Sequence, residues 1–271
     1  MIEIEQFYKR KNEQIEKMSK NADLAQLTRD WFAKANSFEY SYHFSWLSRP
    51  IIQYPQDIVA IQELIWKIKP DLIIETGIAH GGSLIFSASM LALLDFCEAI
   101  QNGTNIDPGA STRKVLGVDI DIRSHNRDLI EAHPLSANIR MIEGSSIDKS
   151  IIKQVYDFSK PFKKIMIFLD SNHTHDHVLS ELQAYAPLTS IGSYCVVFDT
   201  AVEFLPEDAF SDRPWCIGNN PMTARNEFLE DLVKNPQLGH DGHGLSFVVD
   251  TKIDDKIMIS VAPGGYLKRI R

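Results

Sequence analysis

Residues 71–83 read DLIIETGIAHGGS, and this stretch decides the fold. Its first five residues form a short, mostly apolar run of the kind found in strands that are buried on both faces. The turn TGIAHGG follows, and we expect a helix to begin near Ser83. A strand, a tight turn and a helix in this order form the first part of a βαβ unit.

The same alternation of apolar strands and helices continues along the chain. We expect a helix over residues 176–185 and further strands at residues 114–119, 139–142, 164–170 and 192–199. Strands of this kind separated by helices predict a parallel sheet that is covered on both faces. The fold class is therefore α/β, as a doubly wound, Rossmann-like and mostly parallel sheet.

The two ends of the chain differ from this pattern. Residues 245–250 and 256–261 are separated only by TKIDD, which predicts a hairpin and an antiparallel last strand. Residues 1–36 are charged with apolar positions at helical spacing, and the aromatic-rich residues 38–54 have neither period. Pro55 then begins a helix that Pro70 ends. We therefore predict an N-terminal helical and irregular extension, residues 1–56, before an α/β domain, residues 57–271.

Composition excludes several classes of protein. Of 271 residues, 44% are hydrophobic and 24% are charged, as in ordinary globular domains. A formal net charge of −8 argues against a nucleic-acid binder. The longest apolar-rich stretch, residues 84–94, is too short to span a bilayer, and residues 1–20 lack the apolar centre of a signal peptide. Three widely spaced cysteines without a CxxC pair indicate a reducing compartment, so we expect a cytoplasmic protein with a small-molecule partner.

Candidate site residues lie where the parallel strands end, because open α/β sheets bind ligands beyond the carboxyl ends of their strands. The first strand ends at Glu75, and the turn and helix start after it contain Gly77, Gly81, Gly82 and Ser83. Glycines permit a sharp turn close to a ligand, and a helix N-terminus offers free N–H donors. The spacing GxxxGG differs from the GxGxxG of dinucleotide-binding turns. A tight turn without a ligand is the alternative.

The second and third strands end in groups that suit a nucleoside. Asp119 ends the second strand, where a carboxylate can accept hydrogen bonds from both ribose hydroxyls. Ser145 and Ser146 follow the third strand and can hydrogen-bond an adenine edge. The alternative for Asp119 is a solvated strand end.

The fourth and fifth strands end in the densest group of ionisable side chains. Asp170 begins the sequence DSNHTHDH, whose last two histidines fall at the start of the next helix. His173 is therefore the candidate for proton transfer, and a structural histidine is the alternative. Asp170 and Asp199 end consecutive strands, so their carboxylates can together bind a hard divalent cation. Solvated strand ends are the alternative for this pair.

Taken together, these segments resemble a known family, from about residue 45 to the C-terminus. The segments that carry the resemblance are IIETGIAHGGSL (73–84), GVDID (117–121), EGSSID (143–148), FLDSNHTHDHV (168–178) and APGGYLKRI (262–270). They are similar to the cephalosporin hydroxylase / rhamnosyl O-methyltransferase family. The resemblance implies the class I methyltransferase fold and S-adenosylmethionine as cofactor.

The resemblance also implies residue roles. Asp119 would bind the ribose, and the methionine part of the cofactor would be lined by Glu75, Gly77, Gly81, Gly82 and Ser83, with Asp170 beside it. In the best-described member, Mg²⁺ is held by an aspartate that matches Asp170 and by a Glu-Asp pair after the fifth strand. This sequence keeps Asp199 but has Phe198 in place of the glutamate. Glu203 or a water would then complete the site, and the alternative is that no metal is bound.

We therefore expect an S-adenosylmethionine-dependent O-methyltransferase that acts on a small hydroxylated acceptor, a sugar or nucleotide-sugar. His173 would accept the hydroxyl proton, with Asp170 as the next candidate, and Arg213 and Trp215 in segment 203–220 would contact the acceptor. We expect no nucleic-acid partner and no membrane span, and a homo-oligomer is compatible with this interpretation. The alternatives are an oxygenase-type oxidoreductase, whose iron or nicotinamide motifs we do not find, and a non-catalytic nucleoside-binding subunit, in which His173 would be dispensable.

Overall fold

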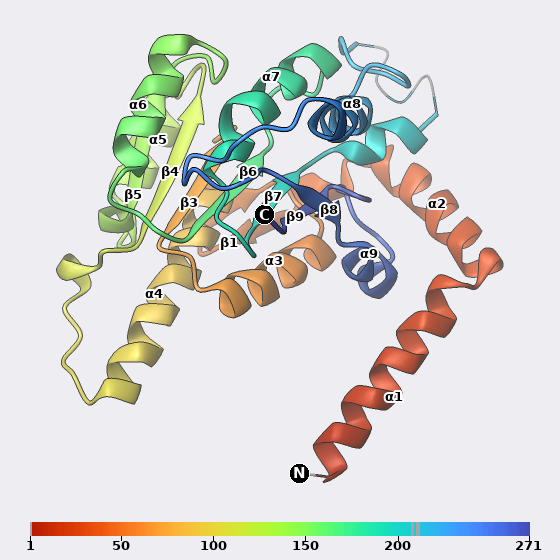
Figure 1. Cartoon of the computed structure of the whole chain (residues 1–271), viewed down its shortest axis with the longest axis horizontal. Helices are drawn as coiled ribbons and strands as arrows, with labels where there is room; N and C mark the ends of the chain where they lie inside the picture. Colours follow the sequence, from red (N-terminus) through yellow and green to blue (C-terminus); the bar gives the residue numbers. More distant parts are fainter. Residues whose placement is uncertain (1, 207–208, 210–211) are drawn as a thin grey trace.

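A seven-stranded sheet forms the centre of the protein in the computed structural model, which describes residues 2–206, 209 and 212–271 (Figure 1). The strand order is β5-β4-β3-β6-β7-β9-β8. The strands are β3 (Leu72–Thr76), β4 (Lys114–Asp119), β5 (Ile139–Glu143), β6 (Ile165–Leu169), β7 (Tyr194–Val197), β8 (Phe247–Val249) and β9 (Tyr266–Arg269). Strands β3 to β7 pair in parallel, and β9 pairs antiparallel with both β7 and β8. The predicted fold class is confirmed.

The sheet is covered on both faces, as the apolar strands predict. The helices are α3 (Pro55–Ile68), α4 (Gly82–Asn102), α5 (Ser124–Glu131), α6 (Lys149–Ser159), α7 (His175–Tyr185) and α8 (Pro221–Lys234). One hydrophobic core lies between the sheet and α3, α4 and α5, and the other lies between the sheet and α6, α7 and α8. Alternate residues of one strand belong to different cores, as Ile73 and Ile74 of β3 do. The order of the strands reverses between β3 and β6, so ligands are expected at the carboxyl ends of this pair.

Helix α4 is long and apolar enough to cross a membrane, judged by length and composition alone. Half of its most apolar 18-residue window is buried inside the protein. Leu84, Leu91 and Leu94 lie in the hydrophobic core with the strands. These contacts are those of a core helix of the α/β sheet.

The N-terminal extension is more regular than the sequence suggests. Residues 2–36 form two helices, α1 (Ile2–Ser19) and α2 (Ala22–Asn36), and Asn21 caps α2 by accepting a hydrogen bond from the Leu24 N–H. The segment predicted to be irregular contains a short 3₁₀ helix, η1 (Tyr40–His43), and an antiparallel pair, β1 (Phe44–Trp46) and β2 (Arg49–Ile51). Helix α1 points away from the sheet in Figure 1.

Aromatic rings hold the segments of the extension together. The Tyr40 ring lies 5.1 Å from the rings of Trp31 and Phe44 and 5.2 Å from that of Tyr54, between centroids. All three pairs meet edge to face, which is a favourable arrangement for aromatic rings. The cluster packs against the core that contains α3 and α4, and the Trp46 ring meets the Phe86 ring of α4 edge to face with centroids 4.9 Å apart.

The predicted closing hairpin is wrong in its second strand. Residues 251–257, TKIDDKI, form helix α9 (Thr251–Ile257), in which Ile253 is buried one turn before Ile257. The strand that pairs with β8 is β9, which begins at Tyr266 instead of Lys256. An antiparallel pair does end the sheet, but a helix and a turn connect its strands.

Candidate active site

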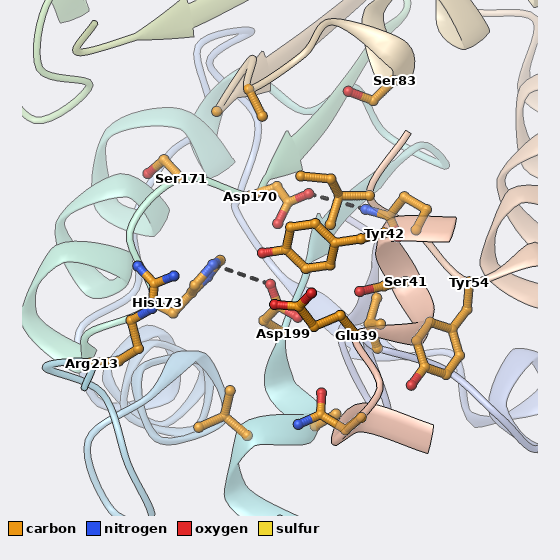
Figure 2. A pocket seen from close by; sticks show the side chains of 18 of the residues that line it. Glu39, Ser41, Tyr42, Tyr54, Ser83, Asp170, Ser171, His173, Asp199 and Arg213 are labelled. Atoms are coloured by element: carbon orange, nitrogen blue, oxygen red, sulfur yellow. Dashed lines mark hydrogen bonds and ion pairs between the residues drawn. The ribbon is translucent and has the colours of Figure 1, made fainter. Parts of the chain in front are cut away.

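A cavity of about 360 Å³ lies at the carboxyl ends of the central strands (Figure 2). This volume lies within the range of small-molecule sites in proteins. Its walls come from the turn after β3, from the ends of β6 and β7, from the segment after β7, and from residues 32–54 of the extension. The extension therefore closes one side of the cavity.

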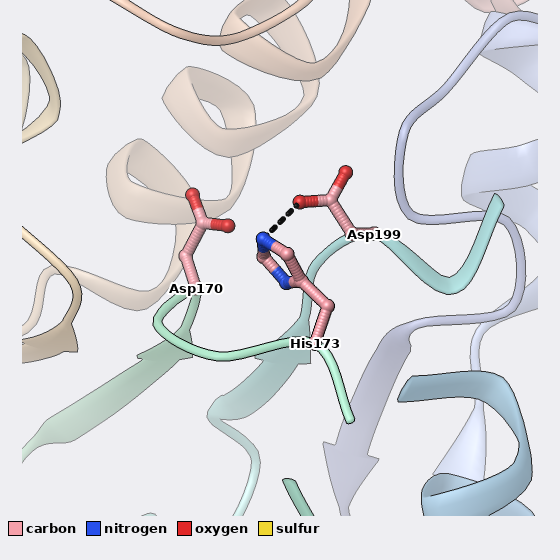
Figure 3. A group of neighbouring side chains, drawn as sticks. All are labelled: Asp170, His173 and Asp199. Atoms are coloured by element: carbon pink, nitrogen blue, oxygen red, sulfur yellow. Dashed lines mark ion pairs between the residues drawn. The ribbon is translucent and has the colours of Figure 1, made fainter. Parts of the chain in front are cut away.

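Asp170, His173 and Asp199 meet in this cavity (Figure 3). One donor atom of each side chain lies within 4.8 Å of the other two. The Nε2 atom of His173 lies 3.2 Å from Oδ2 of Asp199. Asp199 follows β7 and has a left-handed backbone with φ of 53°. The structure thus brings together the catalytic and metal candidates that the sequence predicts.

The electrostatics of the cluster are unfavourable for isolated carboxylates. Burial raises the pKa of Asp170 well above its ordinary value, and the nearby Asp199, Glu75 and Glu181 raise it further. Gln53 Nε2 donates a hydrogen bond to Oδ2 of Asp170 over 3.0 Å, but this amide carries no charge. A bound divalent cation or a proton would relieve the repulsion.

The donor atoms of this cluster fit a divalent metal ion. Carboxylate oxygen suits Mg²⁺ and Mn²⁺, and imidazole nitrogen is a common metal ligand. Phe198 takes no part, because its ring is 3% exposed and packs edge-on against Phe168. Glu203 is neither in this cluster nor in the cavity lining, and its Oε2 atom accepts hydrogen bonds from the Gly218 N–H and the Asn220 amide.

The glycines after β3 are required by contacts within the protein. Gly77 has φ of 89°, and a Cβ atom there would overlap the backbone oxygen of Asp170. A Cβ atom at Gly82 would overlap the Pro50 carbonyl, and one at Gly81 would overlap the Ile130 side chain. Gly77 and Gly82 line the cavity and Gly81 does not. Close packing of the chain therefore accounts for all three glycines, before any ligand is considered.

Glu75 lies behind the cavity wall. It is 2% exposed, and Ser83, which lines the cavity, donates a hydrogen bond to its Oε1 atom. Burial raises the pKa of Glu75 to about 8. Its contact with the cavity therefore passes through Ser83.

The candidates for nucleoside binding lie outside the cavity and have partners within the protein. Asp119 Oδ2 accepts hydrogen bonds from the backbone N–H groups of Ile78, over 2.7 Å, and Ala79, over 3.3 Å. Ser146 is buried and its hydroxyl lies 3.1 Å from His177 Nε2. Ser145 is half-buried in the same turn. Asp119 thus supports the turn after β3. These two bonds use both lone pairs of Oδ2, whereas Oδ1 accepts one hydrogen bond, from the Asp121 N–H over 3.1 Å, and keeps a free lone pair.

Comparison with known proteins identifies the family. Residues 38–270 match the family model described as Rhamnosyl O-methyltransferase/CmcI. The chain belongs to this family. It is 30% identical over 151 residues to the rhamnosyl O-methyltransferase of Mycobacterium tuberculosis strain H37Rv. The aligned residues cover 55% of this chain and 54% of that protein. The match to the Mycobacterium leprae protein of the same name is 30% over 157 residues, or 58% and 60%. The chain thus spans little more than half the length of the curated relatives that it matches.

Solved structures of a family member share the fold. A CmcI structure with Mg and SAM has a TM-score of 0.52 at 14% identity, over 85% of this chain and 78% of that chain. A CmcI apo-structure has a TM-score of 0.52 at 15% identity, over 85% and 77%. The fold of this chain is accordingly the class I methyltransferase fold.

Several cavity residues of this family member were not found from sequence. Glu39, Tyr42 and Gln53 come from the extension, where an aromatic-rich composition is the one signal and does not single them out. Arg213 and Trp215, which the sequence does suggest, line the cavity. The Trp215 ring meets the His173 ring edge-on with centroids 4.7 Å apart.

Proposed function

We propose that the protein is an S-adenosylmethionine-dependent O-methyltransferase whose acceptor is a hydroxyl of a sugar or nucleotide-sugar. The observation that carries this proposal is the Asp170–His173–Asp199 cluster, which faces a cavity bordered by the turn after β3. Family membership and two relatives named rhamnosyl O-methyltransferase support the reaction and the sugar. Because the chain spans only part of these relatives, their acceptor enters here as a proposal.

The cofactor would lie along the turn after β3. Gly77, Gly82 and Ser83 would border its methionine part, with Glu75 behind Ser83. Asp119 would accept a hydrogen bond from the ribose with the lone pair of Oδ1 that the Asp121 N–H leaves free. S-adenosylmethionine supplies a methyl group on a sulfonium centre, whose leaving group departs without a charge. Asp170, at the switch point between β3 and β6, would lie beside the sulfonium.

The residues of this chain then align the acceptor and remove its proton. His173 accepts the proton of the attacking hydroxyl, and Asp199 orients the imidazole and stabilises the imidazolium. Asp170 and Asp199 would hold a divalent cation, and such an ion would supply the charge that lowers the pKa of an acceptor hydroxyl. Alignment of the oxygen with the methyl carbon provides much of the rate enhancement in such a displacement.

Two measurements on the purified protein test the proposal. Calorimetry should detect binding of S-adenosylmethionine and its demethylated product but none of NADH, because the turn is GxxxGG. Mass spectrometry should then find a 14-dalton addition to a sugar, glycoside or nucleotide-sugar in a panel incubated with the cofactor, since a methyl group replaces a proton. Binding of NADH without binding of the sulfonium would refute this function.

The non-catalytic alternative predicts a different result. A nucleoside-binding subunit would bind the cofactor and transfer no methyl group to any acceptor, and the His173→Ala variant would then behave as wild type. A cytoplasmic location and a homo-oligomer stay predictions.

A further inference from the structure

Gln53 connects the extension to the cluster. It precedes α3, is 4% exposed, and lies 117 residues before Asp170, to which its Nε2 atom donates a hydrogen bond over 3.0 Å. It lines both the large cavity and a smaller hollow behind it. An amide donor fixes the rotation of the Asp170 carboxylate without bringing a positive charge that would repel a cation.

The smaller hollow has unusual walls. Its free volume is about 10 Å³, and apolar residues such as Phe86, Phe168 and Phe198 form much of its lining. Three buried atoms that lack a hydrogen-bond partner among the described residues belong to side chains around it: Gln53 Oε1, Glu75 Oε2 and Ser87 Oγ. Buried polar atoms in proteins nearly always have a partner.

The volume of the smaller hollow and the polar atoms around it both fit one buried water molecule. A volume of about 10–15 Å³ is enough for one water, which typically makes about three hydrogen bonds. With Glu75 protonated, Oε2 donates to the water, and the water donates to Gln53 Oε1 and Ser87 Oγ. With Glu75 ionised, the water donates to Glu75 and Gln53 and accepts from Ser87. In both states all three atoms gain a partner.

We propose that Gln53 is a positioning residue, which holds Asp170 in place for a divalent cation and is itself held by one buried water shared with Glu75 and Ser87. The proposal rests on the proposed function, because it assigns Asp170 to cation binding. It also gives the extension a part in the active site, because residue 53 precedes the α/β domain.

The test measures cation binding directly. Gln53→Met keeps the length of the side chain and removes both polar ends, and Gln154→Met makes the same change at an exposed position of α6. With saturating S-adenosylhomocysteine, Mn²⁺ binding is followed by electron paramagnetic resonance of the free ion, and S-adenosylhomocysteine binding is measured by calorimetry. Loss of a residue that orients a metal ligand typically weakens metal affinity about 10- to 100-fold. Gln53→Met should show this loss with cofactor affinity within a few-fold, and Gln154→Met should match wild type in both.

Each result decides the matter. Wild-type Mn²⁺ affinity in a folded Gln53→Met variant overturns the inference. A wild-type protein that binds S-adenosylhomocysteine but no Mn²⁺ also overturns it, and that result is still compatible with the proposed function. A wild-type protein that binds neither refutes the proposed function as well. If Gln53→Met does not melt cooperatively, a high-resolution crystal structure of the wild type with Mn²⁺ decides. A water bonded to Gln53 and Glu75, with the amide on Asp170, supports the inference, and an amide turned away from Asp170 overturns it.

Discussion

The two halves of the sheet treat their strand-end carboxylates in opposite ways. After β4, Asp119 accepts hydrogen bonds from the backbone amides of Ile78, Ala79 and Asp121, so the protein itself solvates its charge. After β6 and β7, Asp170 and Asp199 face each other in a cavity, with one histidine and one neutral amide as polar neighbours. The first arrangement stabilises the turn after β3, whereas the second places two acidic side chains where they repel each other.

This difference distinguishes a carboxylate that stabilises the fold from carboxylates that are available to a ligand or a reaction. Folding alone does not favour two carboxylates placed together in a partly buried cavity, because burial and the neighbouring Asp199 both raise the pKa of Asp170. Groups held in this way are concentrated at functional sites, where a ligand or a reaction uses the charge. We therefore expect substitutions after β6 and β7 to affect turnover, and substitutions after β4 to affect cofactor binding.

The largest effect is expected at His173. Removal of a general base typically costs about 100- to 10,000-fold in rate, so His173→Ala should lower kcat by this factor and change the Kd of S-adenosylmethionine by only a few-fold. His125→Ala, at an exposed position of α5, is the matched control and should keep the wild-type kcat. Retention of more than about a tenth of the wild-type rate would exclude His173 as the base and favour Asp170 or solvent.

Removal of the cation should have the next largest effect. A bound cation contributes several kcal/mol to stabilisation of developing charge, so dialysis against EDTA should lower turnover by about 100-fold. Added Mg²⁺ or Mn²⁺ should restore it, and initial rates at fixed cofactor concentration measure both steps. Full turnover after exhaustive dialysis would show that the paired carboxylates serve without a metal.

Asp119→Ala tests the other half of the comparison. It should weaken binding of S-adenosylhomocysteine by about 1–3 kcal/mol, because a charge-assisted hydrogen bond to ribose is lost and the turn after β3 loses its acceptor. Calorimetry gives the affinity, and kcat at saturating cofactor should stay within a few-fold of wild type. A large loss of kcat with unchanged affinity would erase the proposed distinction between the two halves of the sheet.

Substitution of Asp57 should have the smallest effect on the site. Asp57 also serves as a reference, because it is a buried carboxylate whose hydrogen bonds are all made within the protein. Its carboxylate accepts hydrogen bonds from Ser260, the Val261 N–H and Tyr266, yet burial raises its pKa to about 6 from 3.8. Between these values the folded state keeps a proton that the unfolded state releases. The free energy of unfolding of the wild type should therefore fall as pH rises from about 4 to 6. This fall should be steeper than that of Asp57→Asn by roughly 1.4 kcal/mol per pH unit. Urea titrations at several pH values measure this slope, and equal slopes in the two proteins would contradict the assignment.

The strands and their end residues could be predicted because their signals are local. An apolar run that ends in an acidic residue places Asp119 or Asp170 at the edge of a sheet without knowledge of any distant contact. The strand-to-helix turn at Gly77 is equally local, although the reason for the glycine, contact with the Asp170 backbone, lies almost a hundred residues away. The predicted roles of these residues toward a cofactor stay predictions.

What could not be predicted depends on contacts between distant segments. Gln53 reaches Asp170 across 117 residues of sequence, in a segment whose neighbours Ile51 and Tyr54 lie in the core, and no local pattern distinguishes it from other glutamines. The error at residues 256–261 arose from a run of apolar residues that suits a strand. Ile253 and Ile257 are one helical turn apart, and tertiary packing of Ile253 favours the helix.

The left-handed backbone at Asp199 sets a limit on how this protein can be stabilised. A non-glycine residue in that conformation costs on the order of 1–3 kcal/mol, and glycine would remove this cost. Asp199→Gly would also remove the carboxylate that contacts His173. A screen that selects only for thermal stability would therefore favour Asp199→Gly, although this variant lacks a carboxylate of the cluster. Engineering for robustness should leave residue 199 fixed and seek its gains elsewhere, because stability and activity trade against each other there.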